Sequence, residues 1–531
     1  MASQGREERA WQRVLMMALP GALLATIVLG LVLILGQLDA WQPGFKSGSL
    51  QALMTPDPAA AAGTLGLVGG ALSVAIGIVL IVVVFGIQTT ASRNSPRIIE
   101  LFISDPVNVL ALGLFLGAIA LIFMVRAEIK PTYVPMYGVV ASVILGWVGL
   151  AILLPYVAYM FEVMRAETLI QMVLWKTRRR LRRKPDRRGL RKSVAQISDI
   201  GLGSLDHADV PVCLTAVEAL RRLLVEVYMP LKPGLPAGWF DVSRDEMPGT
   251  SEEVLTLVRR TRTWLEHTVL SFYLDLIGLT PAFRREVVHM IASATGDLGV
   301  AAMKEGDTEV EEQVVRFFNT YLRTALHQRT ATFAYPLMHE YRRLAELALV
   351  SRPALTLEIS EHLLAYGRSF ETNQVSHVVG AAAEEVAEIA SRAIHDGKRE
   401  EALTIAHLLA RSLSEMVAAE RPAGAIGAVL KPVVKLTLHC LSDEHAELAA
   451  VLLSALGQAP RDLVDRALRR LEGTRVDVYY EVGERVVAYD WVEEELRLLI
   501  PTLRTRLEMA GNGATAYPGS QPVISPSKAK L

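Results

Sequence analysis

The feature that most constrains this chain is a strongly basic segment that directly follows a long apolar region. Residues 176–192 contain eleven Lys or Arg residues and one acid, Asp186. Apolar runs dominate the chain before this segment, and amphipathic helical patterns dominate the chain after it. Basic residues beside an apolar span are retained on the cytoplasmic side of a membrane. The segment therefore predicts both an integral membrane protein and its orientation.

Four apolar runs precede the basic segment. Residues 14–38 carry no charge, and the later runs cover about residues 64–87, 107–125 and 133–159. Each is long enough for one helix across a hydrocarbon core of about 30 Å. A cleaved signal peptide is the alternative for the first run, but signal peptides use shorter apolar stretches. Four spans predict a multi-pass protein of the inner (plasma) membrane with both termini in the cytoplasm.

Charge separates the two parts of the chain. Residues 1–192 hold 20 basic and 10 acidic side chains, whereas the remainder holds 35 and 46. An acidic body argues against nucleic-acid binding, and two distant cysteines, Cys213 and Cys440, suit a reducing compartment. The basic segment itself is expected to contact anionic lipids. The contact residues are Arg178, Arg179, Arg180, Arg182, Arg183 and Lys184.

Small residues recur at helical spacing within three of the apolar runs. Lipid supplies no hydrophobic drive between helices, so small side chains help by letting helix backbones approach closely. The pattern predicts helix-packing faces and favours a homo-oligomer; the alternative is that Gly and Ala are simply frequent in this chain. The residues are Gly66, Gly70, Ser73 and Gly77, then Gly113 and Gly117, then Gly138, Ser142 and Gly146.

Two further segments resemble a known family. The loop after the second run carries Gln88, Ser92, Ser95, Pro96 and Arg97. A later segment carries Gln196 and Asp199, followed by Asp209 and Thr215. Over about residues 64–224 the chain resembles a bacterial family of predicted multi-pass membrane proteins with a domain of unknown function. That resemblance implies four N-terminal spans and a Ser-Pro-Arg inner loop, and it implies no particular activity.

The match to this family has one departure and one open reading. Ala208 stands where the family has an asparagine, and extra residues separate Asp209 from Thr215, which puts any role of that turn in doubt. Ser95-Pro96 has the pattern of a helix start. The inner loop is therefore either a short helix on the membrane surface or an ordinary positively charged connection.

Residues 193–509 are expected to form a cytoplasmic helical domain. Amphipathic patterns predict paired helices in an irregular, α-solenoid-like arrangement without a fixed repeat. One helix is expected to stop near Gly296, another to break at Pro336, and Asp396-Gly397 to form a turn. Alternating apolar residues over 475–490 predict one small β-hairpin.

The predicted fold class is thus an all-α membrane protein with four transmembrane helices and a cytoplasmic helical domain. The domains are a four-helix transmembrane domain (1–165), a basic juxtamembrane helix or linker (166–192), the helical domain with its hairpin (193–509) and a disordered tail (510–531).

The sequence contains no motif that signals catalysis, a cofactor or a metal. The central part of each predicted span lacks Asp, Glu, Lys, Arg and His, which argues against a coupled transporter. His207, Asp209 and Cys213 lie close enough together to ligate a metal, although a helix-capping turn is the simpler interpretation. Glu384, Glu385 and Glu388 have the spacing of a solvated helix face.

These features favour a non-enzymatic, homo-oligomeric membrane module whose cytoplasmic domain binds or senses a protein partner. No cofactor is expected, and the partners are the anionic bilayer, copies of the chain and a cytoplasmic protein. The alternative is an ion channel whose pore is formed by the spans of several subunits. A membrane enzyme ranks third, because no catalytic set is visible.

Overall fold

The structure is a computed structural model, and it describes residues 30, 34, 35, 37, 57–93, 105–183, 185–372, 377–442, 445–478 and 488–512. The first predicted span, 14–38, therefore lies almost wholly outside the described residues. So do Ser95, Pro96, Arg97, Lys184 and residues 513–531 of the predicted tail. The chain divides into two compact units, Met1–Ala216 and Val217–Leu531.

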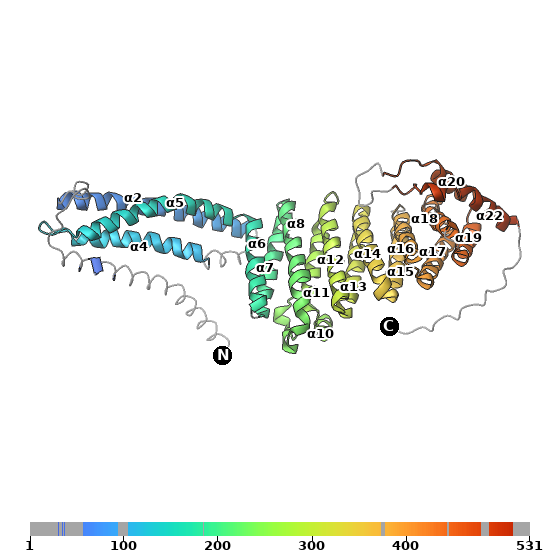
Figure 1. Cartoon of the computed structure of the whole chain (residues 1–531), viewed down its shortest axis with the longest axis horizontal. Helices are drawn as coiled ribbons and strands as arrows, with labels where there is room; N and C mark the ends of the chain where they lie inside the picture. Colours follow the sequence, from blue (N-terminus) through green and yellow to red (C-terminus); the bar gives the residue numbers. More distant parts are fainter. Residues whose placement is uncertain are drawn as a thin grey trace. The chain divides into compact units, whose positions relative to one another are not determined.

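Three apolar helices pack against one another in the first unit (Figure 1). They are α2 (Pro58–Arg93), α4 (Pro106–Glu128) and α5 (Met136–Val163), which correspond to the second, third and fourth predicted spans. All three are long and apolar enough to cross a membrane. Their inner faces bury large side chains such as Leu72 and Phe115, while Leu67 and Leu154 on the outside are 78% and 74% exposed. A chain with these helices is a membrane protein, because such outer faces suit lipid rather than water.

A helical hairpin follows the apolar helices. The sequence predicts that the last span continues into the basic segment, but α5 ends at Val163 and a new helix, α6 (Ala166–Arg183), begins after Met164 and Arg165. The chain then turns at Pro185 and enters α7 (Arg187–Asp206), whose first turn is capped by Asp186 accepting from the Arg188 N–H at 3.1 Å. Both helices run across the direction of α2, α4 and α5 (Figure 1).

The second unit is a series of helices packed side by side (Figure 1). It opens with the end of α8 (Val210–Arg222), which continues through the π-helical turn η2 (Leu223–Tyr228), the short α9 (Met229–Leu231) and three 3₁₀ turns, η3 (Lys232–Gly234), η4 (Ala237–Trp239) and η5 (Arg244–Glu246). The remaining helices are α10 (Glu252–Arg260), α11 (Trp264–Leu279), α12 (Arg285–Glu305), α13 (Thr308–His327), α14 (Ala331–Ser351), α15 (Pro353–Thr372), α16 (His377–His395), α17 (Arg399–Ala418), α18 (Ala423–Ser442), α19 (Ala446–Gln458), α20 (Arg461–Gly473), α21 (Glu494–Arg497) and α22 (Ile500–Asn512).

These helices form two layers. Helices α12, α14, α16, α18 and α20 pack in succession in one layer, and α11, α13, α15, α17 and α19 pack in succession in the other. Helices α11 to α19 also pack on neighbours in the opposite layer, as α15 does on α16. The predicted helical domain is confirmed, and its two-layer order is that of an α-solenoid.

Helix α18 is also long and apolar enough to be a candidate span, yet it behaves as a core helix. Its most apolar window is 61% buried within the protein, against 28% for α2. It packs on α16, α19 and α20, and Lys435 in its middle pairs with Glu384 of α16 at 2.7 Å. A helix surrounded in this way has its apolar surface covered by protein.

The predicted β-hairpin is not supported. The described part of the chain contains no β-strand, and residues 479–487 lie outside it. On the described flanks, the Ala488 N–H donates to the Asp477 carbonyl at 2.7 Å. The hairpin stays a prediction.

Several helix ends differ from the sequence predictions. Helix α12 runs through Gly296 and ends at Glu305, with Gly306 as its C-cap, and α14 contains Pro336 within it. The break expected at Pro336 falls instead at Arg329, which adopts a φ of +53°. The Asp396-Gly397 turn is confirmed, with Gly397 at a φ of +70°. A left-handed residue after a helix lets the next N–H reach back to the last turn, and the Thr330 N–H donates to the Ala325 carbonyl in this way at 3.0 Å.

Candidate functional site

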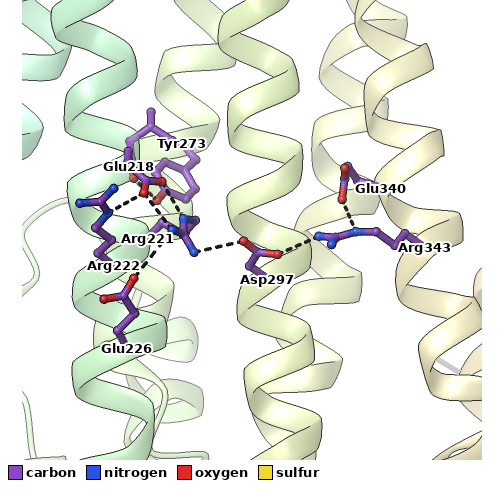
Figure 2. Close-up of polar contacts among 9 residues, drawn as sticks. Glu218, Arg221, Arg222, Glu226, Tyr273, Asp297, Glu340 and Arg343 are labelled. Atoms are coloured by element: carbon purple, nitrogen blue, oxygen red, sulfur yellow. Dashed lines mark hydrogen bonds and ion pairs between the residues drawn. The ribbon is translucent and has the colours of Figure 1, made fainter. Parts of the chain in front are cut away.

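Ion pairs link α8, α12, α14, α16 and α18 of the second unit in series. We call this set the ionic ladder and each ion pair between two helices one of its rungs. Its first rungs meet at Asp297 of α12, which Figure 2 shows between two guanidinium groups. Arg221 of α8 places Nη1 3.2 Å from Asp297 Oδ2, and Arg343 of α14 places Nη2 2.8 Å from Asp297 Oδ1. One carboxylate therefore joins three helices.

Neighbouring carboxylates orient the two arginines of these rungs (Figure 2). Arg221 donates to Glu218 through Nε at 2.6 Å and Nη2 at 2.8 Å, a two-pronged geometry that holds the guanidinium plane. The hydrogen bond from Arg221 is the main cause of a lowered pKa of Glu218. Arg343 Nε donates to Glu340 Oε2 at 2.7 Å. The Tyr273 hydroxyl donates to the Val217 carbonyl at 3.0 Å.

The ladder continues because adjacent residues on one helix reach opposite neighbours. Arg343 pairs backwards with α12, while Arg342 pairs forwards with Glu385 of α16. Glu384 then pairs forwards with Lys435 of α18. Successive helical residues point about 100° apart, so one adjacent pair can face both flanking helices. The last rung joins Lys431 of α18 to Asp490.

Glu384 and Glu385 of the ladder are buried, contrary to the prediction from the sequence. Glu384 and Glu385 were expected on a solvated face, yet each is only 3% exposed. That interpretation was wrong because α14 and α18 cover both sides of α16 with basic side chains. Glu388 is half-buried on the same helix.

A separate buried charge cluster lies at the start of the second unit. Lys232 places Nζ 2.6 Å from Glu266 Oε1 and 2.7 Å from Asp307 Oδ2. Glu266 is fully buried, and burial raises its pKa against the lowering effect of Lys232. Asp307 also caps α13 by accepting from the Val310 N–H at 3.2 Å. The cluster borders a cavity of about 340 Å³ whose lining includes Arg260, Arg262, Glu305 and Glu309.

Another cavity, of about 480 Å³, lies between α15 and α17. Its charged lining residues pair with one another, Arg368 with Glu415 and Arg421 with Glu371. These pairs connect the helices around the cavity, in the same manner as the ladder connects the opposite layer.

The small residues of α5 face neighbouring helices. A Cβ atom at Gly146 would lie 2.3 Å from Val68 of α2, and one at Gly138 would lie 3.2 Å from Val125 of α4. Ser142 between them is fully buried. On α4, Gly117 is buried and Gly113 is half-buried.

The predicted stripe on α2 is placed differently. A Cβ at Gly66 would lie 3.0 Å from Arg126 of α4, whereas no described residue lies within 4 Å of one at Gly70 or Gly77. The Ser73 hydroxyl donates to the carbonyl of Gly69 at 2.7 Å. Gly69, which the sequence pattern missed, packs on Ile122, since a Cβ there would lie 2.8 Å from it. The α2 stripe therefore stays a prediction about a partner helix.

Asp105 is a second residue that sequence reasoning missed. It directly precedes Pro106 at the start of α4, is 5% exposed, and accepts a hydrogen bond from the Tyr159 hydroxyl of α5 at 2.7 Å. The contact ties the beginning of α4 to the end of α5. An acidic residue followed by proline at the edge of an apolar run is the signal that would have identified it.

The described residues of the family-like segments have mainly local roles. Gln88 is exposed near the end of α2, which also contains Ser92. Gln196 is buried and Asp199 half-buried on α7. Asp209 accepts from the Val212 N–H at 3.4 Å at the start of α8, and the Thr215 hydroxyl donates to the Pro211 carbonyl at 2.8 Å.

The turn before α8 is a capping turn, as the simpler interpretation predicted. Cys213 is fully buried, and burial raises the pKa of its thiol to about 11. Among the described residues, no group of three His, Cys, Asp or Glu side chains could hold a metal ion.

The basic side chains of α6 lie on its exposed surface. Leu169, Val173 and Leu181 are buried, whereas Trp175 is 58% exposed. The Arg179 guanidinium lies 5.4 Å from the centre of the Trp175 ring. Arg178, Arg180, Arg182 and Arg183 are exposed as well.

Residues 7–201 match a family model described as "Predicted membrane protein (DUF2254)". This part of the chain is similar to DUF2254 proteins. The family resemblance expected from the inner loop and from Gln196 and Asp199 is thereby confirmed. The DUF2254-like region contains α2, α4, α5, α6 and most of α7, and it ends before Asp209 and Thr215.

Other comparisons add little to the DUF2254-like region. No curated protein matches the chain. One solved structure, titled "Circular tandem repeat protein with novel repeat topology and enhanced subunit contact surfaces", is similar at 15% identity with a TM-score of 0.35. That match covers 78% of this chain and 99% of the other.

Proposed function

We propose that this chain is a non-enzymatic, homo-oligomeric protein of the inner (plasma) membrane whose second unit binds or senses a protein partner in the cytoplasm. The observation that carries the proposal is the ionic ladder. Its paired charges, of which Glu384 and Glu385 are buried, tie α8, α12, α14, α16 and α18 to one another in series. Charged side chains that pair with one another between helices have a structural role, which favours a binding scaffold over a catalytic centre.

A two-layered helical series is well suited to protein recognition. Stacked helices present an extended surface, and each helix contacts only near neighbours, so the surface can vary without loss of the fold. The ladder adds stiffness to one layer, because each rung fixes the spacing between two helices. A stiff, extended surface binds a partner with little ordering cost.

The membrane part of the proposal rests on the first unit. The basic segment orients α5 with its C-terminal end, and hence the second unit, towards the cytoplasm. No described residue lies within 4 Å of a Cβ at Gly70 or Gly77 on α2, and another helix can approach closely at such small residues. A second copy of the chain is the proposed occupant, and the exposed arginines of α6 are the proposed contacts with anionic lipid.

Oligomer mass in mild detergent tests the membrane part of the proposal. Gly70→Leu and Ser73→Leu should lower the mass to that of a smaller assembly, because a large side chain prevents close approach. Val82→Leu is the matched control, since Val82 is exposed on the same helix and outside the stripe. A monomeric wild-type protein would contradict the homo-oligomer, and ion flux through reconstituted liposomes would favour the channel instead.

Orientation and partner binding need separate measurements. A reporter that is active only outside the inner membrane should be silent when fused at Ser193 and active within residues 42–62. A photo-crosslinking residue at exposed Glu361 or Arg411 in the second unit should yield an adduct heavier than the oligomer in cells, whereas the same residue at Leu67 should not. If no exposed position of the second unit gives an adduct, partner binding is contradicted.

A further inference from the structure

We infer that one face of α6, carrying Trp175 and Arg179, lies on the cytoplasmic surface of the bilayer and binds anionic lipid headgroups. The inference rests on the membrane orientation given in the proposed function. It adds the direction of the helix, the face that meets the lipid, and an aromatic anchor that composition alone did not single out.

The direction of α6 follows from the corner at its start. Helix α5 ends at Val163, and α6 runs across the direction of the apolar helices (Figure 1). Met164 at the corner packs on α2, since a Cβ at Gly86 would lie 2.5 Å from its Sδ. The Thr168 hydroxyl also donates to Glu162 at 3.3 Å across the corner. If α5 crosses the bilayer, α6 therefore runs along the membrane surface.

The two faces of α6 have different partners. The buried side chains Leu169, Ile170, Val173, Leu174 and Leu181 form one face, and α6 packs on α7. The apolar face is thus covered within the protein, unlike that of a common surface helix, which inserts its apolar face into lipid. The opposite face carries exposed residues three or four positions apart: Gln171, Trp175, Arg178, Arg179 and Arg182.

The chemistry of the exposed face fits a headgroup layer. Tryptophan is enriched at membrane interfaces because its ring is apolar and its N–H is polar. Arg179 stacks over Trp175, and guanidinium groups bind phosphate oxygens in a planar, two-pronged geometry. Residues 175–183 contain six basic residues and no acid. The connection to α5 places α6 beside the bilayer, and α7 covers its buried face, which favours lipid over a soluble acidic partner for the exposed face.

Site-directed spin labelling tests the inference on the full chain in nanodiscs of phosphatidylcholine with one-third phosphatidylglycerol. Gln171→Cys carries the label on the Trp175 face. Leu67→Cys on α2 provides the lipid-exposed standard, and Glu361→Cys on α15 provides the water-exposed standard. Native Cys213 and Cys440 are buried. The measured quantity is the access of a water-soluble nickel complex relative to that of oxygen.

The Gln171 label should be shielded from nickel and accessible to oxygen, closer to the Leu67 standard than to the Glu361 standard. Trp175→Ala and Arg179→Gln should each reduce this shielding, whereas Arg411→Gln on α17 should leave it unchanged. Shielding should weaken in pure phosphatidylcholine and at high salt, because exposed charge pairs are screened.

Three outcomes would overturn the inference. They are a Gln171 label as nickel-accessible as the Glu361 standard, shielding that arises only after a soluble extract is added, and shielding that is insensitive to lipid charge and salt. Oligomer mass on the same samples separates this inference from the proposed function. A monomer with a shielded Gln171 contradicts the homo-oligomer alone, and an oligomer with an exposed Gln171 contradicts the lipid face alone.

Discussion

The two units of this protein hold their helices together by different means. In the first unit, α5 approaches α2 and α4 through Gly138 and Gly146, whose missing side chains make room for Val125 and Val68. In the second unit, long charged side chains reach between helices, as Arg342 does to Glu385. The same secondary structure is thus stabilised by close backbone approach in one unit and by paired charges in the other.

The surroundings of each unit explain this difference. Lipid is as apolar as a leucine side chain, so burying apolar area between spans yields little, and dispersion contacts at close range replace it. Water instead drives apolar faces together, and a helix series in water can also keep charges at partly exposed boundaries. Large exposed apolar residues are accordingly concentrated on α2, α4 and α5, among them Ile81, Leu110 and Trp147.

The largest expected effect is the loss of a ladder rung. Arg342→Met should destabilise the second unit by about 3 kcal/mol, because it removes the guanidinium that pairs with the buried carboxylate of Glu385. Labelling of native Cys440, buried on α18, should become about a hundredfold faster. Cys213 in the first unit should label at its original rate.

Two controls test whether pairing causes this effect. Arg316→Ala removes an exposed pair with Glu312 and should cost no more than about 0.5 kcal/mol. Arg342→Met combined with Glu385→Met should recover most of the loss, because both charges are then gone. If the exposed pair matters as much as Arg342, the ladder does not distinguish the second unit.

A side chain in the close contact between α5 and α2 should have the next largest effect. Gly146→Leu should destabilise the apolar bundle by about 1–3 kcal/mol, since even its Cβ would lie 2.3 Å from Val68. The rate of hydrogen exchange should rise in α2, α4 and α5 and should stay unchanged in α14 and α16. Gly70→Leu is the comparison, because no described residue lies within 4 Å of a Cβ there. Equal exchange in the two variants would show that close approach does not set the stability of the bundle.

A smaller, pH-dependent effect should be confined to the second unit. Burial raises the pKa of Glu266 above its unfolded value of 4.5, so the folded state holds the proton more tightly than the unfolded state. Stability from this group is therefore present at low pH and falls as pH rises from about 4.5 through the folded pKa. Protection of α11 against hydrogen exchange should fall across this window.

The Glu266→Gln variant isolates this contribution, because it cannot titrate. Its α11 protection should change less with pH than that of the wild type, while Glu312→Gln at an exposed site should follow the wild type. Groups whose pKa is lowered in the folded state, such as Glu218, have the opposite effect on the pH dependence of stability. These groups are present in the wild type and in both variants. A steeper pH dependence in Glu266→Gln would reverse the assigned direction.

The smallest effect concerns helix ends in the second unit. Glu420 follows α17 with a φ of +49°, a conformation that costs a non-glycine residue about 1–2 kcal/mol. Glu420→Gly should raise the stability by up to about 1 kcal/mol after the added freedom of the unfolded chain is subtracted. The melting temperature of the full chain measures this gain in stability. Gly306→Ala should lower the melting temperature. A lower melting temperature for Glu420→Gly would contradict the strain at this position.

These helix ends also show where sequence reasoning reaches its limit. The Asp396-Gly397 turn was predicted because glycine marks it, but Arg262, Arg329 and Glu420 adopt the same left-handed conformation without any turn signal. The sequence predicts that a helix ends near Gly296, yet this residue lies inside α12. A Cβ there would lie 3.2 Å from both Arg343 and Glu340. Local composition does not distinguish a glycine that ends a helix from one that makes room for another.

The sequence by itself determined the features that depend on local composition. The second to fourth apolar runs, the basic segment and the helical character of the second unit are encoded in residues close together in the chain, because helix formation and membrane insertion act on contiguous segments. Which charges are buried was decided by tertiary structure. Glu384 and Glu385 resemble a solvated pair until α14 and α18 pack on either side of α16. The ladder joins residues more than forty positions apart, so its pairing depends on which helices become neighbours, and that is a property of the packed fold alone.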